Sequence, residues 1–397
     1  MNPLRSLLTD SAVSASLICA LLIVVMIDRA SPGKPKSGPN QEEVVTVVEE
    51  PAQPPRPPVL GVTPPKYDDM GKLLSKLGEG GRGYAFDQIP MEDFEATERL
   101  AKYDVIFWTC GVNPRHWFED RVIGAAERPG VNTAAIREEV YSKVKESVRS
   151  FVSKGGTLYA SDWRFLDLRL CFPELVGDDD VAEGDAQTLQ AEVVEPTLIN
   201  RLGSTVELKF DLNGWFPAQI DAREATVYLR GAYTTRQGRR TVRAPLLVKV
   251  PFGQGTIIFT AFHNEKINSE VETKLLEFLV FDSVLAKESA KLRKVIVSGG
   301  FSPQRTDILN ASSGAQAETL TYQNTRRGKL VFALSFNNEG AKLRMTVKGP
   351  QGKSHVKEGG TSFTVEVPDA EPGEWTYTVT ALSVPYAKFP YSVIVGD

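Results

Sequence analysis

Apolar residues recur with different spacing in different parts of the chain, and the spacing predicts the elements. Residues 104–109 form a short run that is apolar nearly throughout, as expected for a strand buried on both faces of a parallel sheet. A stripe with helical spacing follows, made of Ile136, Val140, Val144, Val148, Phe151 and Val152. Gly155 and Gly156 end that helix, and residues 157–160 read as the next strand.

The same alternation starts earlier and continues further along the chain. Strands are predicted at 59–62 and 84–89, with a helix at 68–77 between them. Later strands are predicted at 206–212, 225–230 and 245–250, and a capping box at Ser269–Glu272 predicts a closing helix. We therefore expect residues 67–287 to form an α/β domain with a parallel sheet and right-handed crossovers.

After residue 294 the pattern changes to short segments in which apolar and polar residues alternate. Strands are predicted at 320–322, 329–336, 342–347, 362–367, 375–379 and 391–395. Turn residues such as Gly349–Pro350 and Pro372–Gly373 separate them. Residues 295–397 are therefore expected to form an all-β sandwich.

The first thirty residues differ from both patterns and predict a membrane anchor. Residues 12–27 carry no charge, and the apolar stretch extended over 7–27 approaches the roughly 20 residues that cross a bilayer. A cleaved signal peptide, a lipoprotein signal and a buried core helix are the alternatives. Asp28–Arg29–Ala30 is a poor cleavage site, Cys19 lies inside the apolar run, and a Pro-rich stretch follows at once. We expect an uncleaved transmembrane helix within residues 1–30.

The Pro-rich stretch, residues 31–66, is expected to be an extended spacer rather than a folded element. Counting Lys and Arg on the two sides of the apolar segment does not favour a cytoplasmic N-terminus. Long domains are translocated largely regardless of such charges, and bacterial signal-anchors commonly export the domain that follows them. The expectation is a single-pass membrane protein of a bacterium with an extracytoplasmic, periplasmic body.

The net charge and the cysteine content limit which partners and cofactors are expected. The formal net charge is −4, without a basic stretch interleaved with aromatics, so nucleic acid is not expected as a partner. The three cysteines show no metal-binding spacing, and neither a metal nor another cofactor is predicted. Cys110 and Cys171 could form one bridge, depending on the compartment.

Residues 151–160 lead into Ser161, Asp162, Trp163 and Arg164, at the position where a central strand of an α/β sheet turns into a helix. Residues 255–265 form a second motif, a strand that ends in Phe-His-Asn-Glu. Together these motifs resemble the class I glutamine amidotransferase-like superfamily over about residues 59 to 285. The resemblance implies a flavodoxin-like α/β fold. It places His263 and Glu265 at the histidine and glutamate positions of that family's catalytic triad.

The chain departs from this family at the nucleophile. Asp162 or Ser161 stands where active members carry cysteine, and Trp163 or Arg164 stands where they carry a small residue. Cys110 follows an earlier strand and Cys171 lies past the turn, so neither is expected to replace the missing thiol. The site is therefore expected to be degenerate, with Asp162, Ser161, His263 and Glu265 as candidate catalytic residues. Trp163 and Arg164 are candidate ligand-binding residues.

Residues 372–377, Pro-Gly-Glu-Trp-Thr-Tyr, resemble a strand entry of immunoglobulin-like and prepeptidase C-terminal domains of secreted bacterial proteins. This resemblance implies an adhesion or assembly role for the C-terminal domain. The leading expectation is a membrane-anchored, non-catalytic pseudoenzyme that acts as a binding or scaffold protein in a larger assembly or homo-oligomer. A hydrolase that uses Asp162 or Ser161 with His263 is one alternative. A protein that binds a carbohydrate or another small molecule beside Trp163 or Trp215 is the other.

Overall fold

The computed structural model describes residues 56–78, 83–111, 130, 132–176, 181–220, 223, 225–237, 240–263, 270–337 and 340–397. The predicted anchor at 7–27, most of the spacer, Ser269 and Glu265 lie outside these residues. Among the helices in the described ranges, none combines the length and the hydropathy that a bilayer-spanning segment needs. Residues 53–397 belong to one compact unit.

A nine-stranded sheet forms the centre of the α/β part within the described ranges. In spatial order its strands are β2 (Phe86–Gln88), β1 (Leu60–Val62), β3 (Val105–Trp108), β4 (Thr157–Ser161), β9 (Gly255–Thr260), β8 (Thr241–Phe252), β7 (Thr226–Thr234), β5 (Gln187–Val193) and β6 (Thr205–Phe210). The first five strands, from β2 to β9, pair in parallel. The pairs from β9–β8 to β5–β6 are all antiparallel. The prediction of a parallel sheet was therefore wrong for half of it. Only two residues separate β8 from β9, so the chain reverses there and the two strands pair in antiparallel fashion. The strands β5 to β8 thereby join the same sheet.

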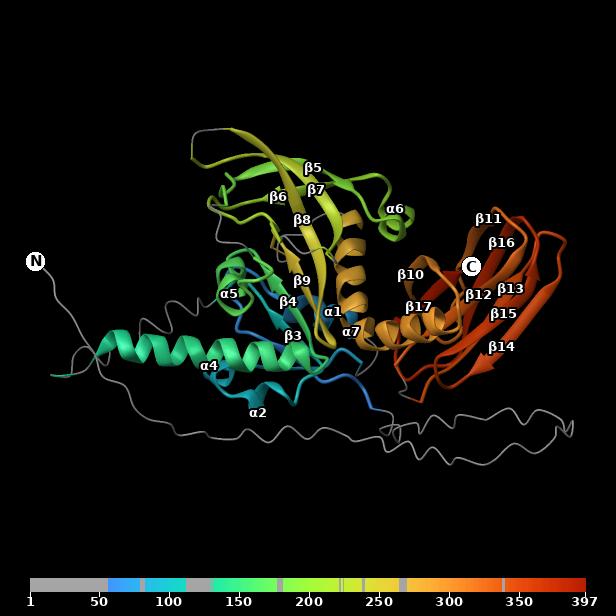
Figure 1. The fold of residues 1–397 in the computed structure, drawn as a ribbon, viewed down its shortest axis with the longest axis horizontal. Helices are drawn as coiled ribbons and strands as arrows, with labels where there is room; N and C mark the ends of the chain where they lie inside the picture. The colour runs from blue at the N-terminus through green and yellow to red at the C-terminus, as the bar shows by residue number, and fades with distance from the viewer. Residues whose placement is uncertain are drawn as a thin grey trace, which may run out of the picture. The chain divides into compact units, whose positions relative to one another are not determined.

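Helices cover both faces of this sheet (Figure 1). One face packs against η1 (Met91–Glu95), α2 (Thr97–Leu100), α4 (Thr133–Ser153) and α5 (Arg164–Cys171). The other face packs against α1 (Met70–Leu77) and α7 (Glu270–Ser298), while α6 (Pro196–Leu202) lies beside β5 and β6. In β3, Ile106 and Trp108 enter one core and Val105 and Phe107 enter the other. The predicted strand buried on both faces is confirmed.

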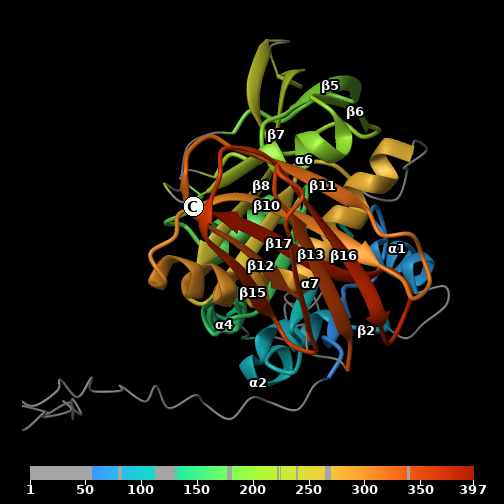
Figure 2. The ribbon, with the colours of Figure 1, turned by 90° about the vertical axis from the view of Figure 1, so that its right-hand side faces the viewer.

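The C-terminal part consists of two four-stranded antiparallel sheets within the described residues. One has the order β10 (Pro303–Ala311), β17 (Phe389–Gly396), β12 (Gly328–Ser335), β15 (Phe363–Ala370). The other has the order β11 (Thr319–Asn324), β16 (Gly373–Ser383), β13 (Lys342–Lys348), β14 (Ser354–Gly359). Phe332 of the first sheet contacts Trp375 and Tyr377 of the second, so the sheets pack face to face. Figure 2 shows these strands toward the viewer.

The strand pairing in this sandwich follows a simple rule. β10 pairs with β17, β11 with β16, β12 with β15 and β13 with β14. The chain is thus one long hairpin rolled into two sheets, which is the jelly-roll arrangement. It differs from the immunoglobulin arrangement implied by residues 372–377. The segment itself lies where the resemblance placed it, at the entry into β16.

Helix α7 packs against both parts of the molecule. Leu275, Leu276 and Leu279, near its N-terminal end, are buried in the same core as the α1 side of the nine-stranded sheet. Leu292 and Ile296, near its C-terminal end, pack with Val331, Ala333 and Ile394 of the sandwich. One continuous helix therefore contributes to the cores of both.

Candidate functional site

Three polar side chains converge at one edge of the nine-stranded sheet. Cys110 comes after β3, Asp162 directly after β4, and His263 after β9. These strands are neighbours and run in parallel, so their carboxyl ends meet at the same edge. Asp162 has φ of 48°, a left-handed conformation uncommon for a residue other than glycine. The sharp turn predicted between strand and helix is thus present, and α5 begins two residues later.

The three side chains contact one another. His263 Nε2 lies 2.8 Å from Asp162 Oδ2, and the thiol of Cys110 donates to the same oxygen over 3.7 Å. The other oxygen, Asp162 Oδ1, accepts a bond from the backbone N–H of Phe216 at 3.1 Å. Asp162 is only 2% exposed. Both oxygens of its carboxylate are therefore occupied by protein groups and shielded from water.

Further polar contacts hold the backbone at Cys110 and the ring of His263. The backbone N–H of Cys110 donates to Ser161 Oγ at 2.9 Å, and that hydroxyl donates to the buried carboxylate of Asp68 at 2.6 Å. His263 Nδ1 lies 3.5 Å from Asp211 Oδ1, so carboxylates face both ring nitrogens.

Burial and pairing set the protonation states of this cluster. Burial raises the pKa of Asp162, although its bonds to His263 and Phe216 act in the opposite direction. Burial lowers the pKa of His263, but its hydrogen bonds to Asp162 and Cys110 and the charges of these groups outweigh burial and raise the pKa to about 11. The pairing thus favours the charged form of each group, the carboxylate of Asp162 and the imidazolium of His263. Burial raises the pKa of Cys110, which favours the thiol over the nucleophilic thiolate.

The structure brings the predicted residues Asp162 and His263 together and gives the neighbouring ones other roles. Ser161 is fully buried, and its hydroxyl is bound to Asp68. Arg164 is 2% exposed; its Nε donates to Thr109 O and its Nη1 pairs with Asp167. Trp163 is 37% exposed, and its ring lies nearly perpendicular to that of Phe216, at 82°. Of the two predicted ligand-binding side chains, Trp163 alone has substantial exposed surface.

Cys110 and Asp211 belong to this cluster but were not predicted for it. Cys110 was set aside because it follows an earlier strand than the turn at Asp162. Its strand nevertheless pairs with β4, so its thiol reaches the same edge. Both cysteines in the described ranges, Cys110 and Cys171, are free and buried. Cys171 lies in the core on the α4 side of the sheet.

Comparison with known proteins adds distant structural likenesses. No protein-family profile matches the chain, and no curated protein matches its sequence. A cytoplasmic protein from Salmonella typhimurium is similar over 55% of this chain and 95% of its own, at 15% identity and a TM-score of 0.33. A second one, from strain LT2, is similar over 59% and 98%, at 13% identity and a TM-score of 0.35. A glutamine amidotransferase from Thermotoga maritima is similar over 61% and 94%, at 14% identity and a TM-score of 0.31. Likenesses this distant do not establish a family or a function.

Trp163 and Trp215, the two aromatic residues considered for a carbohydrate site, differ in their exposure to solvent. Trp215 is 2% exposed, stacks on Phe210 and donates from its indole nitrogen to Asp185 O. It is a core residue rather than a stacking platform. Trp163 keeps an exposed face, so a carbohydrate beside it stays an untested alternative.

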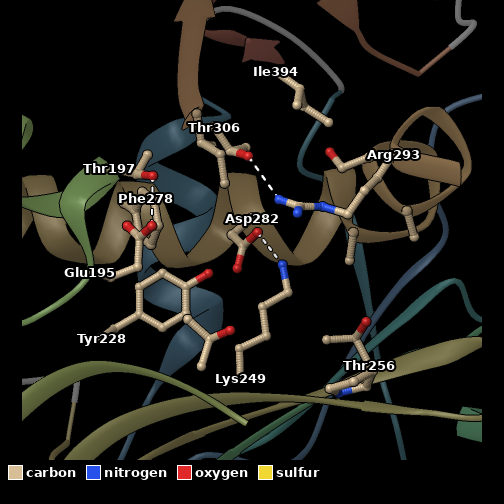
Figure 3. Close-up of a pocket in the computed structure, with 16 residues that line it drawn as sticks. Glu195, Thr197, Tyr228, Lys249, Thr256, Phe278, Asp282, Arg293, Thr306 and Ile394 are labelled. Atoms are coloured by element: carbon tan, nitrogen blue, oxygen red, sulfur yellow. Dashed lines mark hydrogen bonds and ion pairs between the residues drawn. The ribbon is translucent and has the colours of Figure 1, made fainter. Parts of the chain in front are cut away.

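A second polar region lies away from this cluster, where α7 crosses the sheet next to the sandwich. It is a pocket of about 360 Å³, shown in Figure 3. Lys249 Nζ pairs with Asp282 Oδ1 at 2.5 Å, and Arg293 donates to Thr306 Oγ1 at 3.0 Å. The pocket includes Thr256 near the start of β9, whereas His263 follows the end of that strand. The two polar regions are therefore at opposite ends of β9.

Proposed function

We propose that this protein is a membrane-anchored, non-catalytic binding or scaffold protein whose α/β part is a pseudoenzyme. The observation that carries the proposal is the state of Asp162, which stands where a nucleophile is needed. Its two carboxylate oxygens accept bonds from Phe216, His263 and Cys110, and the side chain is buried. A nucleophile must be exposed to its substrate and activated by a base. Neither Asp162 nor the Asp68-bound hydroxyl of Ser161 meets that requirement.

The remaining parts of the proposal come from the sequence. The apolar segment at 7–27 and the Pro-rich stretch at 31–66 support a single-pass anchor with a spacer, and we propose an extracytoplasmic body. The jelly roll contributes a second folded surface, which fits a role in assembly with other proteins or further copies of the chain.

The proposal that the protein has no catalytic activity is tested with the full-length protein purified in detergent. Ammonia release from glutamine and hydrolysis of a p-nitrophenyl ester are measured for the wild type, His263→Ala and His355→Ala. We expect no turnover above background in any of them. His355 is the matched control, because it lies on β14 in the sandwich. Wild-type turnover that persists in His355→Ala and is lost in His263→Ala would support the hydrolase alternative.

The proposed scaffold role predicts that the protein leaves its native membrane in an assembly of several chains rather than as a single chain. Mild detergent extraction followed by size-exclusion chromatography with light scattering should give a protein mass well above 43.6 kDa. Recombinant protein produced alone provides the comparison, since it distinguishes a homo-oligomer from an assembly with other proteins. A protein mass equal to one chain in both preparations would contradict the scaffold role.

A further inference from the structure

We propose that Cys110, Asp162 and His263 form a binding site for a thiophilic divalent cation, with Zn²⁺ as the expected ion. The proposal goes beyond the binding or scaffold role and does not depend on it. One sulfur, one carboxylate oxygen and one imidazole nitrogen from these residues all lie within 4.8 Å of one another. This donor set suits zinc, whereas calcium and magnesium prefer oxygen ligands alone.

Two of the three distances between the donor atoms can be compared with the spacing around a single zinc ion. Zinc bonds of about 2.0–2.3 Å in a tetrahedral arrangement separate neighbouring ligand atoms by roughly 3.3–3.8 Å. Cys110 Sγ lies 3.7 Å from Asp162 Oδ2, and His263 Nε2 lies 2.8 Å from the same oxygen. The imidazole needs to move away from the carboxylate by about half an ångström for all three to meet one ion.

A second and independent observation is the group behind the imidazole. Histidines that bind metals generally direct their other ring nitrogen to a carboxylate or carbonyl, which fixes the tautomer. Asp211 Oδ1 occupies this position, 3.5 Å from His263 Nδ1. A neutral imidazole carries one N–H, so it can donate to only one of the two carboxylates that face it. If Nδ1 donates to Asp211, the lone pair of Nε2 is directed at the ion.

The other two ligands are supported in the same way. The bond from Phe216 N to Asp162 Oδ1 leaves Oδ2 directed at Cys110 and His263. The bond from Cys110 N to Ser161 Oγ holds the segment that carries the thiol. Ion binding would displace the thiol proton and the proton on Nε2, as metal ligands require. Three protein ligands leave the fourth position of a tetrahedral ion for water or a bound molecule.

The test uses Co²⁺ as a spectroscopic probe with the full-length protein after treatment with a chelator. We expect one Co²⁺ per chain, with a thiolate-to-cobalt charge-transfer band and the strong visible bands of a tetrahedral ion, both lost when Zn²⁺ is added. Cys110→Ser should abolish the charge-transfer band. Asp211→Asn should keep that band while weakening affinity about 10- to 100-fold.

Cys171→Ser and Cys19→Ser are the controls and should bind Co²⁺ like the wild type. Far-UV circular dichroism in chelator shows whether each variant is folded, and Asp211→Asn keeps the test decisive if Cys110→Ser does not fold. The proposal is overturned if the wild type shows no thiolate-to-cobalt band. It is also overturned if Cys171→Ser or Cys19→Ser removes the band, or if folded Cys110→Ser retains it.

Discussion

Replacing Lys249 with methionine should lower the free energy of unfolding by about 3–5 kcal/mol. The change removes the cation that pairs with Asp282 at 2.5 Å, while the side chain of Asp282 is only 4% exposed. Without Lys249 the charge of Asp282, a nearly buried side chain on the wall of the pocket, loses its partner. Urea unfolding of Lys249→Met and the wild type, followed by far-UV circular dichroism, measures the difference.

Two further variants distinguish the cost of leaving the charge of Asp282 unpaired from the cost of losing the lysine side chain. The double variant Lys249→Met/Asp282→Asn should recover most of the stability, because the uncompensated charge is gone. Lys143→Met breaks an exposed pair with Glu139 on α4 and should change stability by less than about 0.5 kcal/mol. Equal losses for Lys249→Met and the double variant would show that Asp282 is not the source of the effect.

Trp375→Ala should destabilise the jelly roll by about 3–5 kcal/mol, the usual cost of removing a buried large aromatic side chain. Trp375 is 4% exposed, packs across the sandwich against Phe332 and donates from Nε1 to Glu371 O at 3.0 Å. The expected loss combines a cavity between the two sheets with a missing hydrogen bond. Thermal and urea unfolding of the purified protein, followed by far-UV circular dichroism, measures it.

Trp375→Phe separates these two contributions, since phenylalanine fills much of the space but donates no hydrogen bond. It should cost clearly less than the alanine variant. Val356→Ala on β14 is the surface control, because Val356 is 57% exposed. A loss below about 1 kcal/mol for Trp375→Ala would mean that the ring contributes little to the packing between the sheets.

Much of the element pattern could be predicted from the sequence because it depends on local spacing. The stripe from Val140 to Val152 identifies α4, and the uninterrupted apolar run identifies β3. The order of strands could not be predicted in the same way. β4 pairs with β9, although the four strands β5 to β8 lie between them in the sequence. That pairing depends on tertiary packing, for which spacing along the chain holds no signal.

The same distinction explains the candidate site. Asp162 and His263 could be predicted because each closely follows a strand, in a motif resembling known amidotransferase elements. Cys110 also follows a strand, but its relevance appears only once β3 and β4 are known to be neighbours. Asp211 follows β6, which lies at the far edge of the sheet, and the chain beyond it returns toward Asp162 at Phe216. No local pattern marks such a return.

The rolled-hairpin pairing of the sandwich has a consequence for how the protein is made. β17 is synthesised after all the other strands, yet it lies between β10 and β12 in the finished sheet. Until the ribosome has released this segment, β10 has no neighbour and β12 has an open edge, and both edges can pair with other chains. The sandwich can therefore close only after translation has reached its final strand.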